Sequence, residues 1–161
     1  MNAVDFGGLY ERHAADVYRF ALYLTGSRAD AEEIASETFV RAWIASGAIR
    51  TQTVKAYLFS IARNLHIEGL RRRRTLGEMP ADVRDRAPGP EAAAAGRDAL
   101  DGVLAALQQM PEVDRAAVLM RADGLAYDEI ARALGLSPAA VRVRVHRVRM
   151  KLTADGHGGV R

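Results

Sequence analysis

Apolar side chains recur every three or four positions along most of this chain, and that spacing is typical of amphipathic helices. Glycines, prolines and short polar segments separate these stretches and act as helix ends. The pattern predicts helices over 5–24, 27–45, 54–73, 99–110, 112–123, 127–134 and 138–151. Aromatic residues make up only 6% of the chain, which favours helices over sheets. The expected fold class is therefore all-α.

The helical pattern is interrupted between residues 76 and 98. This segment holds mixed charges and the helix breakers Gly77, Pro80, Pro88, Gly89, Pro90 and Gly96. A structureless segment of this length is unusual inside one compact domain, so it indicates a domain boundary. We expect two small helical domains joined by a flexible linker at 76–98. The first, at 1–75, has three or four helices, the second, at 99–155, has four, and a disordered tail follows at 156–161.

The last two predicted helices are separated by a tight turn with three helix-boundary signals: Gly135, Ser137 as an N-cap and Pro138 at the first helical position. One stripe of the final helix should pack inward, and its members are Val141, Val145, Val148 and Leu152. The opposite side carries Ala139, Val143 and His146, flanked by Arg142, Arg147 and Arg149. Small residues let a helix approach a surface closely, and guanidinium groups suit phosphates and guanine edges. The pattern predicts a helix-turn-helix with a basic recognition helix.

An ordinary helical hairpin with a solvated basic face would share much of this pattern, but the charge distribution favours DNA. Residues 138–151 hold four arginines, one lysine and no acid, whereas 99–137 hold three basic and six acidic residues. A second cationic run, at 71–74, ends the third predicted helix. Cations complement the dipole at a helix C-terminus, but four in succession exceed that need and indicate phosphate contact.

The overall composition excludes several other functions. The chain has no cysteine, so thiolate metal sites, disulfides and cysteine nucleophiles are excluded. No apolar run reaches the roughly 20 residues of a membrane span, and the N-terminus lacks a signal-peptide pattern. His13 and His157 have no partner at ligand spacing. We expect a cytoplasmic protein with no metal, no cofactor, no small-molecule substrate and no membrane contact. The net charge of +3 makes a polyanion a plausible partner.

Three segments, in this order and spacing, carry a resemblance to a known family. They read DAEEIASETFVRAW at 30–43, YLFSIARNL at 57–65 with Glu68 and the arginine run behind it, and GLAYDEIA at 124–131 with the turn and basic helix that follow. Together they resemble bacterial RNA polymerase sigma factors of the sigma-70 family, extracytoplasmic-function (ECF) type. The resemblance covers nearly the whole chain, and its domains would be sigma region 2-like and sigma region 4-like.

The resemblance implies a role for each segment. The first would dock on the clamp helices of the largest subunit of core polymerase, through Asp30, Glu33, Ser36 and Glu37. The loop at 46–53 would capture a base flipped out of the minus-ten element, and the third helix would hold the melted strand. The last segment would read the minus-thirty-five element. The implied DNA-binding residues are Arg50, Lys55, Arg63, Asn64, Arg71, Arg72, Arg73, Ser137, Ala139, Ala140, Arg142, Val143, His146 and Arg147. Members of this family are commonly held inactive by an anti-sigma protein, which is a further implied partner.

Two other functions compete with this interpretation. The first is a stand-alone helix-turn-helix repressor or activator, with 1–75 as a ligand-binding or dimerisation domain; the arginine run at 71–74 argues against it. The second is an enzyme, for which the sequence offers neither a glycine-rich phosphate loop nor a convergent set of histidines and acids.

Overall fold

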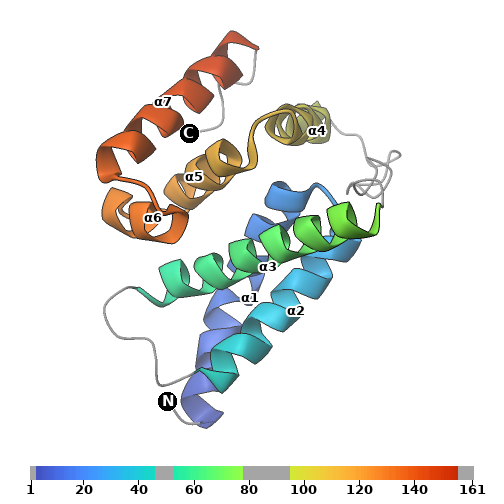
Figure 1. The fold of residues 1–161 in the computed structure, drawn as a ribbon, viewed down its shortest axis with the longest axis vertical. Coiled ribbons are helices and arrows are strands. Elements are labelled where there is room, and N and C mark those ends of the chain that lie inside the picture. Colours follow the sequence, from blue (N-terminus) through green and yellow to red (C-terminus); the bar gives the residue numbers. More distant parts are fainter. Residues whose placement is uncertain (1–2, 46–52, 78–94, 156–161) are drawn as a thin grey trace. The chain divides into compact units, whose positions relative to one another are not determined.

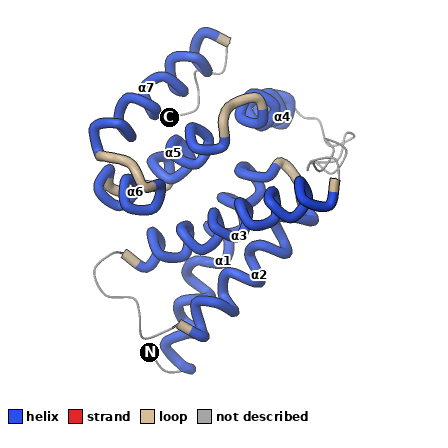
Figure 2. Tube along the Cα trace, in the orientation of Figure 1, coloured by secondary structure: helices blue, strands red, loops and turns tan. Residues whose placement is uncertain are grey.

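The computed structural model describes residues 3–45, 53–77 and 95–155, and within these ranges the chain is helical with no strand (Figures 1 and 2). The helices are α1 (Ala3–Thr25), α2 (Arg28–Ile44), α3 (Val54–Leu76), α4 (Ala95–Gln108), α5 (Glu112–Ala122), α6 (Tyr127–Leu134) and α7 (Pro138–Ala154). The chain divides into two compact units, Met1–Asp85 and Arg86–Arg161. The predicted all-α class is confirmed. The predicted helix from residue 99 begins four residues earlier, at Ala95.

The first unit is a bundle in which α1, α2 and α3 contact one another. Its core contains Val17, Phe20, Ala21, Leu24, Ala31, Phe39, Ala42, Ala56, Leu58, Phe59 and Ala62. At its centre the rings of Phe20 and Phe59 stack, with centroids 4.4 Å apart and planes 11° from parallel. Apolar burial and aromatic stacking at this point hold α1 and α3 together.

The turn between α1 and α2 is built from local signals. Gly26 adopts a left-handed φ of 72°, and the Ser27 hydroxyl accepts a hydrogen bond from the Asp30 N–H at 3.2 Å. The reciprocal half of a capping box is absent, because the Ser27 N–H donates to Thr25 Oγ1 at 3.1 Å. The Asp30 carboxylate instead accepts from Arg73. The sequence Ser27-Arg28-Ala29-Asp30, a serine with an acid three residues later, predicts a variant of the capping box. The capping serine is confirmed, but the Asp30 carboxylate has a different partner.

The buried line of α3 differs from the apolar stripe expected from its sequence. Helical spacing in the sequence predicts an apolar stripe of Val54, Tyr57, Leu58, Ile61 and Leu65, and of these only Leu58 is fully buried. Ala56, Phe59, Ala62 and His66 face the core instead. The two alanines let α3 pack closely against its neighbours, and Phe59 fills the space between helices. The other four residues of the expected stripe are half-buried.

A similar correction applies to the end of α2. Helical spacing in the sequence places Trp43 on one face with Ala31, Ile34, Ala35, Thr38 and Ala42. Trp43 is nevertheless 44% exposed, and Phe39, which is not part of that set, is buried. The Trp43 ring packs edge-on against Phe6 of α1, with centroids 4.9 Å apart. Aromatic side chains therefore cover this end of the bundle without being enclosed by it.

In the second unit, α5, α6 and α7 pack on one another. The predicted inward stripe of α7 is confirmed, because Val141, Val145, Val148 and Leu152 are all at most 3% exposed. They meet a core that includes Ala116, Ala117, Met120, Leu125 and Ile130. The burial of this stripe fixes the opposite side of α7 as the outward face.

Arg115 makes an unexpected connection between α4 and α5. It is only 7% exposed, and its Nη1 donates to the carbonyls of Leu107 at 3.2 Å and Met110 at 3.3 Å. Burial lowers the pKa of this guanidinium, which Glu112 partly opposes. The Leu107 carbonyl also accepts from the Met110 N–H at 3.1 Å, so Arg115 adds a charged donor to the turn that ends α4. Sequence periodicity alone gave no signal for this role.

Candidate nucleic-acid interface

The turn between α6 and α7 positions the basic helix. Gly135 ends α6 with a left-handed φ of 68°, and the Leu136 N–H donates a hydrogen bond to the Ala131 carbonyl at 2.9 Å. Ser137 then accepts from the Ala140 N–H at 3.1 Å, and Pro138 opens α7. This geometry confirms the predicted cap. It also fixes the direction in which α7 leaves the turn.

The outward face of α7 is cationic and open. The residues Ser137, Ala139, Arg142, Val143, His146 and Arg147 are exposed, and Ala140 is half-buried beside them. Val143, near the middle, is 46% exposed. Between Pro138 and Ala154 the helix carries no acid. The face therefore has a shallow centre of small side chains with guanidinium groups along its edges.

The arginines of α7 do not all lie on this face. Arg144 Nη1 forms an ion pair with Asp114 Oδ1 of α5 at 2.6 Å, with both side chains partly buried. Arg149, expected on the flank of the outward face, is half-buried, and its Nε is enclosed. Arg142 and Arg147 are the arginines of α7 that are exposed and lie on the outward face. Arg144 serves the packing of α7 on α5.

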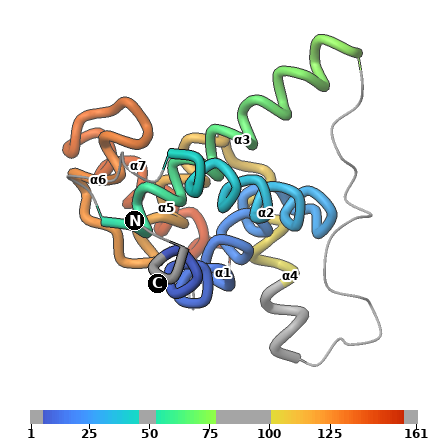
Figure 3. The backbone as a smooth tube through the Cα atoms, turned by 90° about the horizontal axis from the view of Figure 1, so that it is seen from below, coloured from blue at the N-terminus to red at the C-terminus, as the bar shows by residue number. Residues whose placement is uncertain are grey.

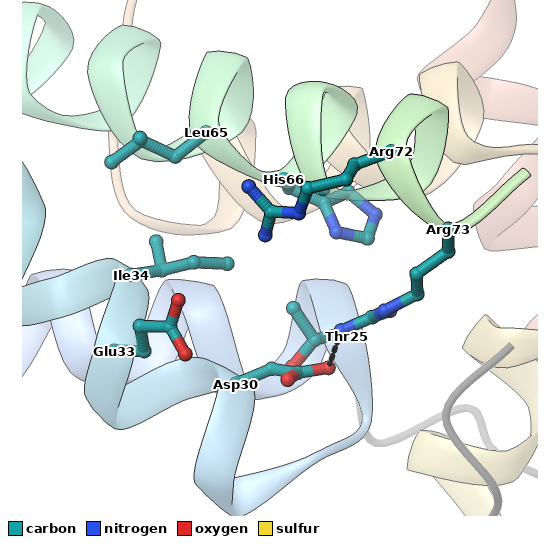
Figure 4. A pocket seen from close by; sticks show the side chains of 9 residues that line it. Thr25, Asp30, Glu33, Ile34, Leu65, His66, Arg72 and Arg73 are labelled. Carbon is teal, nitrogen blue, oxygen red and sulfur yellow. Dashed lines mark hydrogen bonds and ion pairs between the residues drawn. The ribbon is translucent and has the colours of Figure 1, made fainter. Parts of the chain in front are cut away.

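A second cationic surface lies at the end of α3. The last turns of this helix extend toward solvent (Figure 3), and Arg71, Arg72 and Arg74 are exposed. Arg73 is different, because its Nη2 forms an ion pair with Asp30 Oδ2 of α2 at 2.7 Å (Figure 4). The structure thus joins a residue expected to contact polymerase with one expected to contact DNA.

The remaining expected DNA-binding residues of the first unit are dispersed along α3. Arg63 is half-buried and Asn64 is exposed. Lys55 Nζ forms an ion pair with Asp16 Oδ2 of α1 at 3.3 Å. Burial alone would raise the pKa of Asp16, but hydrogen bonds from Lys55 and Arg19 outweigh it and lower the pKa. Arg50 lies outside the described residues.

The acids of α2 border a groove of about 370 Å³ between α2 and α3. Glu33, Ser36 and Glu37 are exposed along one edge, while the lining also contains the apolar side chains of Ile34, Val40 and Leu65. Arg41, Glu68 and Arg72 complete the lining, so the groove combines apolar side chains with three acids and two arginines. It offers both hydrophobic contact and charge to a partner.

A cross-helix ion pair, not foreseen from the sequence, spans the same groove. Arg41 of α2 makes two hydrogen bonds to the Glu68 carboxylate of α3, at 3.1 and 3.3 Å, and also approaches Glu37 at 3.6 Å. The hydrogen bond from Arg41 lowers the pKa of Glu68, and the Glu68 bond raises the pKa of Arg41. The bidentate geometry fixes the guanidinium plane, although the exposure of both groups keeps its contribution to stability small.

Beside this groove is a smaller cleft of about 70 Å³, into which the buried ring of His66 points (Figure 4). Asp30, Glu33, Arg72 and Arg73 also line it. Within the described ranges there is no group of three or more His, Asp or Glu residues arranged to hold a metal ion. In the same ranges no helix is long and apolar enough to cross a bilayer.

Comparisons with known proteins agree with the two-unit architecture. Residues 9–75 match the family described as Sigma-70 region 2, and residues 100–152 match Sigma-70, region 4. Over 144 residues the chain is 34% identical to the ECF RNA polymerase sigma factor SigL of Mycobacterium tuberculosis, covering 86% of this chain and 81% of SigL. It is 36% identical over 151 residues to the ECF RNA polymerase sigma factor SigE of Mycolicibacterium smegmatis, covering 89% of this chain and 58% of SigE.

Two solved structures share the fold. The sigma factor RpoE of Bartonella quintana, in complex with the anti-sigma factor NepR, aligns with a TM-score of 0.74 at 24% identity, over 93% of this chain and 95% of RpoE. CnrH, in complex with the cytosolic domain of CnrY, aligns with a TM-score of 0.70 at 27% identity, over 95% of this chain and 88% of CnrH. The two family matches and the similarity to SigL place the chain among the ECF RNA polymerase sigma factors, non-enzymatic transcription initiation factors of the sigma-70 family.

Proposed function

We propose that this chain binds core RNA polymerase through α2 and promoter DNA through α3 and α7, and so directs transcription initiation. The observation that carries the proposal is the outward face of α7, where exposed Arg142 and Arg147 flank small side chains while the valine stripe is buried behind them. In this proposal residues 1–75 form the polymerase and minus-ten domain. Residues 99–155 form the minus-thirty-five domain, with 76–98 as linker and 156–161 as tail.

The shape of α7 suits the major groove. Recognition helices place their N-terminal residues against base edges, and Ala139, Ala140 and Val143 keep that part of α7 narrow. Arg142 and Arg147 extend from its edges, where guanidinium groups can donate in pairs to guanine or bind phosphates. Ser137 and His146 stand at the same exposed surface as additional donors.

The end of α3 suits the melted minus-ten region. Exposed Arg71 and Arg72 provide cations for the DNA backbone, and Arg63 and Asn64 lie further back on the same helix. Extracting a base from the duplex costs a few kcal/mol, which phosphate contacts can offset. The segment at 46–53, which includes Arg50, is proposed to bind that base. Arg73 would join this surface only when its ion pair with Asp30 opens.

The groove between α2 and α3 suits a helical, basic surface of core polymerase. Glu33 and Glu37 supply negative charge on its edge, and Ile34 and Leu65 supply apolar surface below. We propose the clamp helices of the largest subunit as the occupant, with Ser36 within the contact. Asp30 would act at the margin of this surface because Arg73 neutralises it in the free chain.

We also propose an anti-sigma protein as a regulatory partner. Two proteins with this fold were solved with a bound partner, NepR on RpoE and the cytosolic domain of CnrY on CnrH. The half-buried apolar residues of α3 and the exposed Val40, Trp43 and Ile44 of α2 supply surface that such a protein could cover. Since polymerase and promoters are cytoplasmic, so is the proposed location of this chain.

In vitro transcription tests this function directly. Adding the full chain to core polymerase should produce transcripts with defined starts from genomic DNA, and core alone should not. Glu33→Lys, on the groove edge, should lower transcription and affinity for core several-fold by reversing a complementary charge. Glu32→Lys is the matched control, because Glu32 is exposed on α2 but does not line the groove. A chain that binds promoter DNA alone and never associates with core would instead support a stand-alone regulator.

A second expectation concerns base recognition by α7. Arg142→Ala and Arg147→Ala should each weaken binding of the minus-thirty-five duplex by about 1–3 kcal/mol if the side chain reads a base. Lys151→Ala removes the same charge from an exposed site near the C-terminal end of α7 and should have little effect. Fluorescence anisotropy across a salt series measures all three. Unchanged binding by both arginine variants would show that this face of α7 does not meet DNA.

A further inference from the structure

The ring of Tyr127, the first residue of α6, contacts two arginines of the helix-turn-helix unit. The guanidinium carbon of Arg121, from the end of α5, is 4.4 Å from the centroid of the Tyr127 ring. That of Arg142, from α7, is 4.8 Å from the same centroid. Both distances are well within the range of about 6 Å at which a cation is attracted to an aromatic face. One half-buried ring therefore connects three helices at the edge of the proposed DNA-binding face.

Arg121 is fixed to the turn that precedes α6. Its Nη1 donates to the Leu125 carbonyl at 2.9 Å, and the Leu125 N–H in turn donates to the Met120 carbonyl at 3.1 Å. Leu125 is only 2% exposed, and Gly124 supplies the left-handed φ of 90° that this turn requires. Arg121 is thus held at two points, by the turn and by the ring. Arg121 therefore keeps the Tyr127 ring next to Arg142 of α7.

Arg142 differs from Arg121 because it is exposed and lies on the outward face of α7. A solvent-exposed arginine samples many rotamers, and ordering it on a ligand reduces affinity. A preformed ring contact removes part of that cost before the ligand arrives. Of the two exposed arginines on this face, Arg142 is the one that lies over an aromatic ring, and within the described residues Arg147 makes no such contact.

We propose that Tyr127 is a positioning residue for DNA recognition: its ring, held by Arg121, keeps the Arg142 guanidinium aligned on the DNA-facing side of α7. This inference rests on the proposed function, since it requires α7 to meet promoter DNA. In this proposal Tyr127 of α6 affects DNA binding indirectly, by positioning the side chain of Arg142. It also predicts that the aromatic ring of Tyr127, and not its hydroxyl, is the required feature.

A double-mutant cycle tests the proposal. The full chain, assembled with core polymerase, is titrated onto the minus-thirty-five duplex of a promoter identified by transcript mapping. Tyr127→Leu should weaken binding about three- to tenfold, which is the expected effect of a lost cation–π contact and a mobile arginine. Tyr127→Phe should bind like the wild type. In the Arg142→Ala background, Tyr127→Leu should cause no further loss, because the side chain that it positions is gone.

Salt dependence separates positioning from direct contact. Tyr127→Leu leaves the Arg142 charge in place, so the slope of log affinity against log salt should match the wild type. Arg142→Ala should reduce that slope by about one if the guanidinium meets a phosphate. Thermal melting of each variant shows whether the unit remains folded. Loss of fold in Tyr127→Leu would reappear in the Arg142→Ala background, so the cycle remains decisive.

Two outcomes overturn the inference alone, and a third overturns the proposed DNA-binding face as well. If Tyr127→Leu binds like the wild type while Arg142→Ala is weakened, the ring does not position the arginine. If the two losses add in the double variant, Tyr127 has an independent structural role. If Arg142→Ala and Arg147→Ala both bind like the wild type, the proposed DNA-binding face is itself wrong, and the inference falls with it.

Discussion

Replacing Phe59 with alanine is expected to unfold the first unit of this sigma factor. Its side chain is completely buried, and its ring stacks on Phe20 at 4.4 Å. Removing a buried phenylalanine costs about 3–5 kcal/mol, from lost apolar burial and the cavity that remains. Because a unit of this size has a small core, that cost is a large share of its total stability. The second unit contains no part of this core.

Amide NMR of the full chain would follow both units separately. In Phe59→Ala, dispersed signals of α1, α2 and α3 should collapse while those of α5, α6 and α7 persist. Tyr57→Ala is the control, because Tyr57 lies two residues earlier on α3 and is only half-buried. It should retain the folded signals. If Phe59→Ala kept a native spectrum, or Tyr57→Ala were the more damaging change, the observed packing of α3 would be incorrect.

The buried face of α3 differs from the face that its apolar residues predict, which shows where sequence pattern alone cannot assign the core. Large apolar residues marked the stripe at Tyr57, Ile61 and Leu65, but the core face passes through Ala56 and Ala62. Alanine contributes little to a hydrophobic pattern, yet it allows the closest approach between helices. In α7 no such ambiguity arises, because its inward positions are three valines and a leucine and its outward ones are mostly charged or small. That stripe was therefore predictable residue by residue.

The candidate site shows the same division between local and long-range information. The cap at Ser137 and most of the exposed face of α7 depend on neighbours within a few residues, and the sequence predicted them. Arg149, expected on that face, is half-buried. The ion pairs of Asp30 with Arg73 and of Arg144 with Asp114 join residues 43 and 30 positions apart. Such contacts depend on how helices rotate and how deeply they pack, which local periodicity does not specify. Arg115 was missed for the same reason.

The first unit decides between the functions that the sequence left open. A helix-turn-helix occurs in repressors and activators as well as in sigma factors, so the second unit alone could not separate them. Residues 9–75 match Sigma-70 region 2, which is a different domain from the ligand-binding or dimerisation domain expected of a repressor. The proposed contact with promoter DNA then explains the exposed arginines at the end of α3, which a dimerisation domain would not need.

Replacing Val145 with aspartate is expected to unfold the second unit, because Val145 is 1% exposed within the inward stripe of α7. A carboxylate buried there without a partner costs several kcal/mol. Circular dichroism should show lost helix and a broadened thermal transition. DNA binding should disappear with the fold.

Val143→Asp is the matched control, because it makes the same chemical change two residues earlier on the same helix, where the side chain is 46% exposed. Its helix content and melting should stay close to the wild type. Binding of the minus-thirty-five duplex should nevertheless fall by about tenfold or more, since the new carboxylate would face phosphates and base edges. The pair of variants therefore separates stability from recognition on one helix. If Val143→Asp unfolded the unit, or Val145→Asp remained folded, the two faces of α7 would have to be exchanged.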